Sequence, residues 1–283
     1  LRDKARLLSH LLRWRLRWDR RDLDCHPGPG VSERFMTVRD AVARIPDRAT
    51  VISSGMAGNA RCSAVFWAVG ERFAAKGAPR GLTWLSVGAQ GGRGRAPGTV
   101  EELAGSGLLA RYISGHVETA KALLDLAERG ELALHVLPQG EMARLIAGQA
   151  EGRTSLTSPT GVGTFLDPRC GTGSPVGGSD DESLIEAADE GLEYRLPPID
   201  VALFAASYAD CDGNVYFRDM ATLTESVESV RAARRNGGLA MAVVQRVDEP
   251  AGEAVGVAAA DLDAVCVNPW HEQSVAAWQG EPW

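Results

Sequence analysis

The residues best suited to chemistry lie in short glycine turns that follow hydrophobic runs. The turn at residues 53–59 contains Gly55, Gly58 and Asn59. Backbone amides at such a turn, and at the start of the helix predicted from Cys62, point outward and attract negative charge. An oxyanion hole needs preorganised donors of this kind. A tight strand-to-helix turn without a ligand explains the same residues, so both interpretations stay open. The spacing differs from the G-x-G-x-x-G fingerprint of dinucleotide-binding proteins.

A second candidate site lies at Gln139 and Gly140, which follow the hydrophobic run 132–137. Ligands of open α/β folds bind beyond the carboxyl ends of the strands, where Gln139 would lie. A neutral amide donates a hydrogen bond to a thioester or carboxylate oxygen without adding charge. The alternative is an amide that only caps its own helix.

A third candidate site is the sequence Gly161-Val162-Gly163-Thr164. One glycine on each side of a single residue lets a ligand or a neighbouring chain approach the backbone closely. We therefore expect Gly161, Gly163 and Thr164 to contact a ligand. A β-bulge, or a bend at a subunit contact, is the alternative.

Two polar side chains extend this set. Gln90 lies in the glycine-rich segment 88–94, and His116 follows the hydrophobic run 109–114. Both would reach the same edge of a sheet as the glycine turns. The glycine-rich segment also fits a flexible loop, and a single histidine near a strand end is typical of a structural residue.

The segment 210–214 superficially resembles a calcium loop. The later glycine and bidentate glutamate positions of such a loop do not fit, and a turn between two strands explains the segment better. We therefore predict no metal site in the chain.

The composition limits the class of protein. The 283 residues are 45% hydrophobic and 24% charged, as in a globular protein with a substantial core. No apolar run reaches the roughly 18 residues that a membrane span needs. The five cysteines are dispersed without a Cys-x-x-Cys pair, which argues against a disulfide framework or a zinc site and favours a reducing cytosol. We expect a cytoplasmic protein with no membrane partner.

The first 21 residues are strongly basic, whereas the whole chain carries a net charge of −7. The apolar core of a secretory signal is missing after the basic start, and Asp3 and Asp19 argue against a mitochondrial presequence. A basic helix is compatible with nucleic-acid binding, but an appended amphipathic helix is the simpler interpretation, and we expect no nucleic-acid partner. Apolar residues at helical spacing should pack on a partner or on the rest of the chain: Leu1, Ala5, Leu8, Leu12 and Leu16.

Beyond this helix the chain alternates between strand-like and helical runs. Residues 22–34 form a linker rich in proline and glycine, and Thr37 is a predicted N-cap for a short helix through Ile45. Segment 171–181, rich in glycine, serine and aspartate, predicts a mobile loop. Strands are predicted at 50–54, 82–87, 109–114, 132–137, 201–206, 215–217, 239–244 and 264–267. Helices are predicted at 62–75, 117–129, 140–148 and 226–235.

The run Val201–Ala206 is apolar on both faces, which is typical of a buried parallel strand covered by helices on both sides. Alternation of strands with helices implies right-handed crossovers. We predict an α/β fold with a doubly wound, mostly parallel, Rossmann-like sheet, helices on both of its faces, and the N-terminal amphipathic helix in addition. The expected division is residues 1–34 for the helix and linker and residues 35–283 for the α/β domain.

In order and spacing, these motifs resemble the alpha, or N-terminal, half of family I coenzyme A transferases, particularly the propionate and acetate type. The resemblance runs from about Met36 to Pro269. It includes the Gly55 turn, Gln90 in its glycine loop and the pair Gly115-His116. It continues through 137–140, 161–169, 199–203 and 236–238. The resemblance implies the alpha-domain fold of that family.

The resemblance also implies a ping-pong exchange, in which a glutamate carboxylate attacks an acyl-CoA and passes the CoA to a carboxylic acid. Coenzyme A thioester is then a substrate, and no tightly bound cofactor is implied. The family's glycine turn helps to stabilise the oxyanions, which implies this role for Gly58 and Asn59. The residues implied on the acyl side of the cleft are Gln139, Gly140, Gly161, Gly163 and Thr164.

The family's catalytic glutamate lies in a beta half of similar fold, and no acidic residue of this chain matches its motif. The resemblance therefore implies an alpha subunit that is inactive alone and is completed by a beta subunit in a heterodimer or heterotetramer. The alternatives are a CoA-transferase-like decarboxylase or hydrolase subunit, and a noncatalytic assembly subunit that kept the fold.

Arg61 and Cys62 stand where the family's turn usually has a Pro-Glu-like pair. A cation at Arg61 suits recognition of a second carboxylate, or marks altered substrate use. Cys62 at a helix N-terminus would have a lowered pKa, or would be a structural cysteine.

Overall fold

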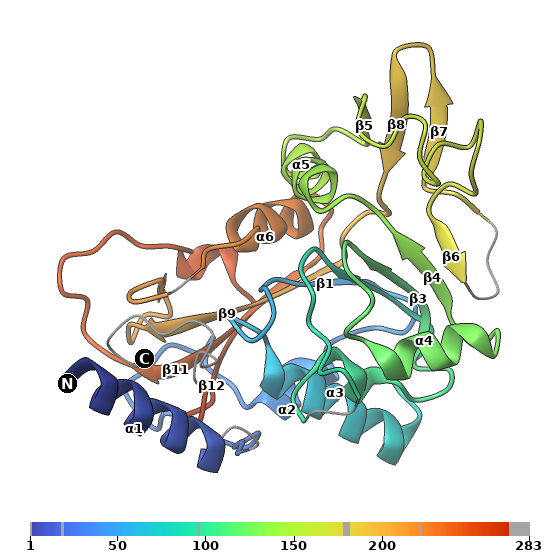
Figure 1. Cartoon of the computed structure of the whole chain (residues 1–283). Coiled ribbons are helices and arrows are strands. Elements are labelled where there is room, and N and C mark those ends of the chain that lie inside the picture. Colours follow the sequence, from blue (N-terminus) through green and yellow to red (C-terminus); the bar gives the residue numbers. More distant parts are fainter. Residues whose placement is uncertain (1, 18–19, 95–96, 178–181, 221, 272–283) are drawn as a thin grey trace.

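A mixed β-sheet forms the centre of the chain. The computed structural model describes residues 2–17, 20–94, 97–177, 182–220 and 222–271 (Figure 1). The main sheet has nine strands in the order β12-β11-β9-β1-β2-β3-β4-β6, with β10 paired to β9. All of its pairs are parallel except β4–β6 and β9–β10. The strands are β1 Thr50–Ser53, β2 Leu82–Ser86, β3 Leu109–Ser114, β4 Ala133–Val136, β6 Pro175–Gly177, β9 Val201–Ala209, β10 Val215–Tyr216, β11 Leu239–Val247 and β12 Ala264–Val267.

Helices cover both faces of this sheet. In Figure 1, α2, α3 and α4 lie on one face, and α5 and α6 lie on the other. Their bounds are α2 Val38–Ala43, α3 Ser63–Lys76, α4 Lys121–Glu128, α5 Gln139–Ala150 and α6 Ser226–Arg235, with short 3-10 turns at Val100–Leu103 and Ala259–Asp261. Successive strand side chains point to opposite faces, so Val51 joins the core under α3 and Ile52 the core under α5 and α6. The predicted doubly wound, mostly parallel α/β fold is confirmed.

The order of the strands reverses at β1. From β1 the sheet continues through β2, β3 and β4 on one side, and through β9, β11 and β12 on the other. Because these strands are parallel, the loops that follow β1, β2, β3 and β4 all leave the sheet at one carboxyl edge. Ligands of open α/β sheets bind at this edge, beside the point of reversal.

A second sheet is not predicted by the sequence. It has three antiparallel strands in the order β5-β8-β7, and it lies beyond α5 (Figure 1). The strands are β5 Ser155–Ser158, β7 Ile185–Ala188 and β8 Gly191–Arg195. They are short and mix polar with apolar residues, so they lack the apolar run by which the strands of the main sheet are identified.

The predicted mobile loop 171–181 is partly wrong. Strand β6 forms within it and pairs with β4, and the backbone amide of Val136 donates a hydrogen bond to Ser174 O at 2.9 Å. Residues 178–181 lie outside the described residues. Pairing to an existing edge strand stabilises three residues that have no strand pattern of their own.

Several helices and strands begin or end at residues other than those predicted. Helix α4 begins at Lys121 rather than Val117, because the chain first turns at 117–120, where the Ala120 amide donates to Val117 O. Strands β9 and β11 extend past their predicted ends, because they pair with each other as far as Val247 and Ala209. The turn predicted at 210–214 does connect two paired strands, β9 and β10.

The N-terminal segment forms the predicted helix, α1 Arg2–Arg17. Leu8, Leu12 and Leu16 expose 65%, 63% and 64% of their surface, so these leucines do not pack on the rest of the chain. Leu1 lies outside the described residues. Within the described ranges, no helix combines the length and apolar character required to cross a membrane.

The linker and the first short helix lie against the sheet. Leu23 is buried, and the Asp22 amide donates a hydrogen bond to Asn268 Oδ1 at 3.2 Å. Thr37 is the N-cap of α2, as predicted, because its side chain accepts a hydrogen bond from the Asp40 amide. Helix α2 ends earlier than predicted, at Ala43.

Candidate active site

The first glycine turn is a closed loop at the carboxyl end of β1. Gly55 has φ +122°, and a Cβ at this position would lie 2.7 Å from Ala60 O, so only glycine fits without displacement of the backbone. The loop is closed by two backbone hydrogen bonds, from Met56 N to Asn59 O at 3.0 Å and from Asn59 N to Met56 O at 2.8 Å. The turn therefore presents a defined set of backbone donors.

One amide in this turn is available to a ligand. The Ala57 amide donates to Ala89 O, and the Gly55 amide donates to Thr224 Oγ1 at 3.1 Å. No hydrogen bond described for the chain uses the Gly58 amide. Asn59 Oδ1 is buried, again without a partner among the described residues. Unused polar groups of this kind suit a ligand, since buried polar groups are normally hydrogen-bonded.

Gln90 holds this turn from behind. Its side chain is fully buried, and its Oε1 accepts a hydrogen bond from Ser53 Oγ at 2.7 Å. Its Nε2 donates to Ser53 O at 2.9 Å and to Gly55 O at 3.2 Å. Both ends of the amide are thus used within the chain, and the contact of Gln90 with a ligand stays a prediction.

The glycine-rich loop after β2 is also fixed by hydrogen bonds. Glu101 Oε1 accepts from the amides of Gly92 at 2.8 Å and Gly94 at 3.0 Å, and Glu101 Oε2 accepts from Ala122 N at 3.2 Å. One buried carboxylate thus connects the loop to the start of α4.

The ends of β2, β3 and β4 meet around Gly115 and Gln139. A Cβ at Gly115 would lie 2.2 Å from Gln139 Cγ and 2.7 Å from Val87 O, so the close approach requires glycine here. Helix α5 starts at Gln139 without a side-chain cap. No described hydrogen bond uses the amides of Gln139, Gly140 and Glu141, which leaves donors at the positive end of the helix. His116 is exposed, with Nε2 3.4 Å from Glu118 Oε2.

The third glycine turn is tied to α5 through one carboxylate. Glu141 Oε1 accepts hydrogen bonds from Ser158 Oγ at 2.8 Å and Thr160 Oγ1 at 2.7 Å. This contact places the start of the Gly161 turn beside the first turn of α5.

Within that third turn the polar groups satisfy one another. Thr164 Oγ1 donates to Gly161 O at 2.7 Å, and the Gly163 amide donates to Asp167 Oδ2 at 3.0 Å. Arg169 forms an ion pair with Asp167 at 2.8 Å and holds the pKa of that carboxyl far below its usual value, with the Gly163 amide contributing. The contacts of the described chain join the second and third sites, but none of them connects the third turn to Gly55.

Sequence reasoning misses Glu225. This residue is the N-cap of α6, only 8% exposed, and its Oε1 has no hydrogen-bond partner among the described residues. It follows Thr224, which binds the Gly55 amide, and the hydroxyl of Ser54 lies beside it. Burial, with a smaller contribution from the charge of Glu228, raises the pKa of Glu225 to about 7. An acidic residue before a helix indicates only a cap, so the sequence carries no signal for this burial.

Cys62 is buried and its pKa is raised, by burial first and by the neighbouring Cys266 second. It is therefore the structural cysteine of the two predicted alternatives. Within the described ranges, no group of three or more histidine, cysteine or acidic side chains is placed to hold a metal ion.

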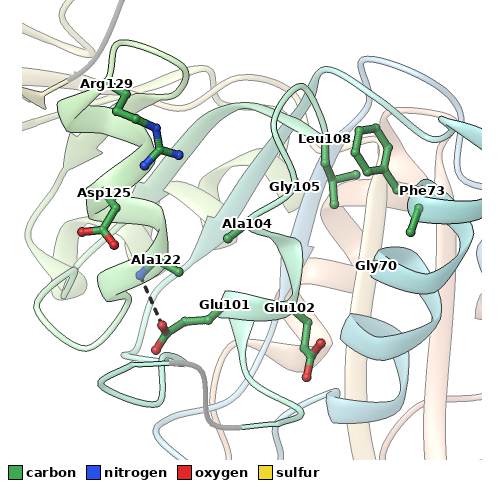
Figure 2. A pocket seen from close by; sticks show the side chains of 11 residues that line it. Gly70, Phe73, Glu101, Glu102, Ala104, Gly105, Leu108, Ala122, Asp125 and Arg129 are labelled. Carbon is green, nitrogen blue, oxygen red and sulfur yellow. Dashed lines mark hydrogen bonds between the residues drawn. The ribbon is translucent and has the colours of Figure 1, made fainter.

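A pocket of about 430 Å³ lies away from these turns, between α3, the 3-10 turn at 100–103 and α4 (Figure 2). Figure 2 shows the hydrogen bond from Ala122 to Glu101 at its wall. None of the predicted site residues lines this pocket, whose wall is formed by Gly70, Phe73, Ala74, Glu101, Glu102, Ala104, Gly105, Leu108, Ala122, Asp125 and Arg129.

Comparisons with known proteins identify the family of the chain. The caffeate CoA-transferase of Acetobacterium woodii is 32% identical over 216 residues, which cover 75% of this chain and 41% of that protein. The acetate CoA-transferase YdiF of Escherichia coli O157:H7 is 27% identical over 246 residues, covering 84% of this chain and 46% of that protein. The chain thus spans less than half the length of these curated relatives.

Two solved structures have a fold similar to that of this chain. The apoenzyme of the acyl-CoA transferase YdiF from Escherichia coli O157:H7 superposes with a TM-score of 0.78 at 26% identity, over 91% of this chain and 51% of that one. Glutaconate coenzyme A-transferase from Acidaminococcus fermentans, 17% identical with a TM-score of 0.61 over 83% of this chain and 75% of that one, shares the fold. The family model described as Coenzyme A transferase matches residues 35–257. This match covers most of the chain, which therefore belongs to the coenzyme A transferase family.

Proposed function

We propose that this chain is the alpha half of an acyl-CoA:carboxylate CoA-transferase. The observation that carries the proposal is the unused Gly58 amide beside Asn59, in a turn locked at the point where the strand order reverses. Preorganised amides at such a place suit the negative oxygen that forms when a thioester carbonyl is attacked. The curated relatives, named as CoA-transferases, support the same reaction.

The proposed reaction has two symmetrical halves. A glutamate carboxylate oxygen from a beta half attacks the thioester carbon, the C–S bond breaks, and an acyl-glutamyl anhydride and CoA thiolate result. The thiolate then attacks the glutamyl carbonyl, the first acid leaves as its carboxylate, and a glutamyl-CoA thioester forms. An acceptor carboxylate reverses these steps and leaves with the CoA. CoA thioester is a substrate throughout, so no bound cofactor takes part in the scheme.

Residues of this chain receive complementary roles. The Gly58 amide and the Asn59 side chain, through its Nδ2 donor, stabilise the oxyanions, while Ser53 and Gln90 keep the turn in place. The free amides at the start of α5, around Gly140, hold the carboxylate of the acid. The third turn, through Glu141, borders this end of the site.

The beta half is proposed to lie on a separate polypeptide that forms a heterodimer or heterotetramer with this chain. The length of the relatives supports the need for a second half, since this chain covers 41% and 46% of them. No acidic residue of the chain carries the family's nucleophile motif, which is consistent with a nucleophile supplied from elsewhere.

The test compares the chain with its complex. The tagged chain is purified from its native host with its bound polypeptide, and a second sample is purified alone after recombinant expression. Each sample is assayed for CoA transfer from acetyl-CoA to short-chain carboxylates, with and without prior treatment by acetyl-CoA together with hydroxylamine, which converts the glutamyl-CoA thioester into an inactive hydroxamate and releases CoA thiol. We expect transfer by the complex, loss of transfer after hydroxylamine, and none from the chain alone. Transfer by the chain alone, or hydrolysis or decarboxylation by the complex without transfer, would refute the proposal.

A further inference from the structure

Arg61 has no carboxylate partner among the described residues. Its Nε donates to Ser63 Oγ at 3.2 Å and its Nη1 to Ala57 O at 3.3 Å, and no ion pair of the described chain includes it. A guanidinium has five N–H donors, so most of them remain unused.

The burial of Arg61 disfavours the charged form of its side chain. Burial lowers the pKa of Arg61 to about 10, whereas hydrogen-bonded carboxylates raise the pKa of Arg39, Arg169 and Arg218. The side chain remains a cation at neutral pH. Partial burial of a cation costs free energy unless an anion compensates it.

Two groups next to Arg61 carry no negative charge. His271 is buried, and desolvation and the charge of Arg61 lower its pKa to about 4, so it is neutral at pH 7. Helix α3 begins at Ser63, directly after Arg61 and Cys62, and its N-terminal end carries a partial positive charge. Neither of these two neighbours therefore compensates the charge of the guanidinium.

Arg61 is also fixed relative to the proposed oxyanion donor. Its hydrogen bond to Ala57 O fastens the guanidinium to the same closed turn that presents the Gly58 amide. A ligand whose reacting carboxylate lies at Gly58 therefore places its next few atoms near Arg61. The phosphates of coenzyme A are separated from the thioester by the long pantetheine arm, which favours the acid rather than CoA as the source of the anion.

We propose that Arg61 binds a second carboxylate on the substrate acid, so that the enzyme selects dicarboxylates over monocarboxylates of equal length. This inference rests on the proposed CoA-transferase function. A guanidinium binds a carboxylate in a bidentate manner, which adds geometric selectivity to the charge attraction.

The kinetic test uses succinate and butyrate, which have the same four-carbon chain and differ in one carboxylate. Both are offered as acceptors to the purified complex with acetyl-CoA as donor. We expect Arg61→Gln to lower the ratio of kcat/KM for succinate to that for butyrate by about 10- to 100-fold, mainly through KM, and Arg61→Lys to restore part of it. Arg80→Gln is the matched control, because Arg80 is an exposed arginine at the opposite edge of the sheet. An unchanged ratio would overturn the proposal.

A binding measurement separates this proposal from the proposed function. The Arg61 Nε–H signal of the isotope-labelled full chain is followed by NMR during titration with succinate, butyrate and inorganic phosphate. We expect a saturable shift with succinate, at least tenfold weaker binding of butyrate, and loss of the response in Arg61→Gln. This result would support the site even if the complex transfers no CoA. A response to phosphate alone, or equal responses to succinate and butyrate, would overturn it.

Discussion

The replacement Glu225→Gln tests whether a buried, uncharged carboxyl lies behind the glycine turn. The pKa of Glu225 rises from an ordinary value of 4.5 to about 7, chiefly because of burial. Below pH 4.5 both the folded and the unfolded chain bind this proton. Between pH 4.5 and 7 only the folded chain keeps it, so Glu225 progressively destabilises the fold as pH rises, and the loss is complete above pH 7.

The magnitude follows from this rise. A tenfold change in proton affinity is worth about 1.4 kcal/mol, so the rise corresponds to about 3 kcal/mol of folding free energy. Glutamine has nearly the same shape and no charge. We therefore expect the stability of Glu225→Gln relative to the wild type to increase by about 3 kcal/mol between pH 4.5 and pH 8, as an order of magnitude.

Urea unfolding at four or more pH values across this range measures the difference. Glu228→Gln is the control on the same helix, and it should retain most of the pH dependence because burial, rather than the charge of Glu228, is the larger cause. A difference between Glu225→Gln and the wild type that stays constant from pH 5 to pH 8 would show that Glu225 carries its charge in the folded chain.

Three further predictions concern the glycine turn and the thiols. Gly58→Val should lower kcat of the assembled enzyme about 10²-fold or more in steady-state assays, and unchanged turnover would remove the oxyanion role of this amide. Gly55→Ala should destabilise the chain by about 1–3 kcal/mol in urea unfolding, because the new Cβ approaches Ala60 O and φ is +122°; equal midpoints would contradict this. In the folded chain, iodoacetamide should label the exposed Cys170 and leave the buried Cys62 unmodified, as mass spectrometry would show; comparable labelling of both would contradict the burial.

The main sheet could be predicted because its strands carry their own pattern. Strand β3, strand β12 and helix α6 begin and end where the sequence predicts, since apolar runs and helical spacing mark them clearly. The second sheet could not be predicted, because β7 has one buried side chain, Ile185, and its stability comes from its pairing with β8. Strand β6 depends in the same way on β4.

The candidate site could be predicted by position more readily than by role. The sequence identified Gly55 and Gln139 because glycine and amide residues follow apolar strands, and the parallel sheet brings these ends to one edge. The inward orientation of Gln90 depends on Ser53, which lies 37 residues away in the chain. The burial of Glu225, and the lack of a carboxylate partner for Arg61 within the described ranges, are likewise properties of packing, which a local sequence pattern does not contain.

The edge of the main sheet opposite the candidate site offers a place to attach a label or a surface. Arg80 and Asp47 lie there, where strands β1 and β2 begin, and the Arg80 amide donates to Asp47 Oδ1 at 3.0 Å. The Gly55 turn and the segments that begin at Gly115 and Gln139 leave from the other rim. A fluorophore or surface tether placed at Arg80 would therefore be separated from the substrates by the full length of the strands. The same separation lets the loops be exchanged for new substrates while the anchoring rim stays untouched.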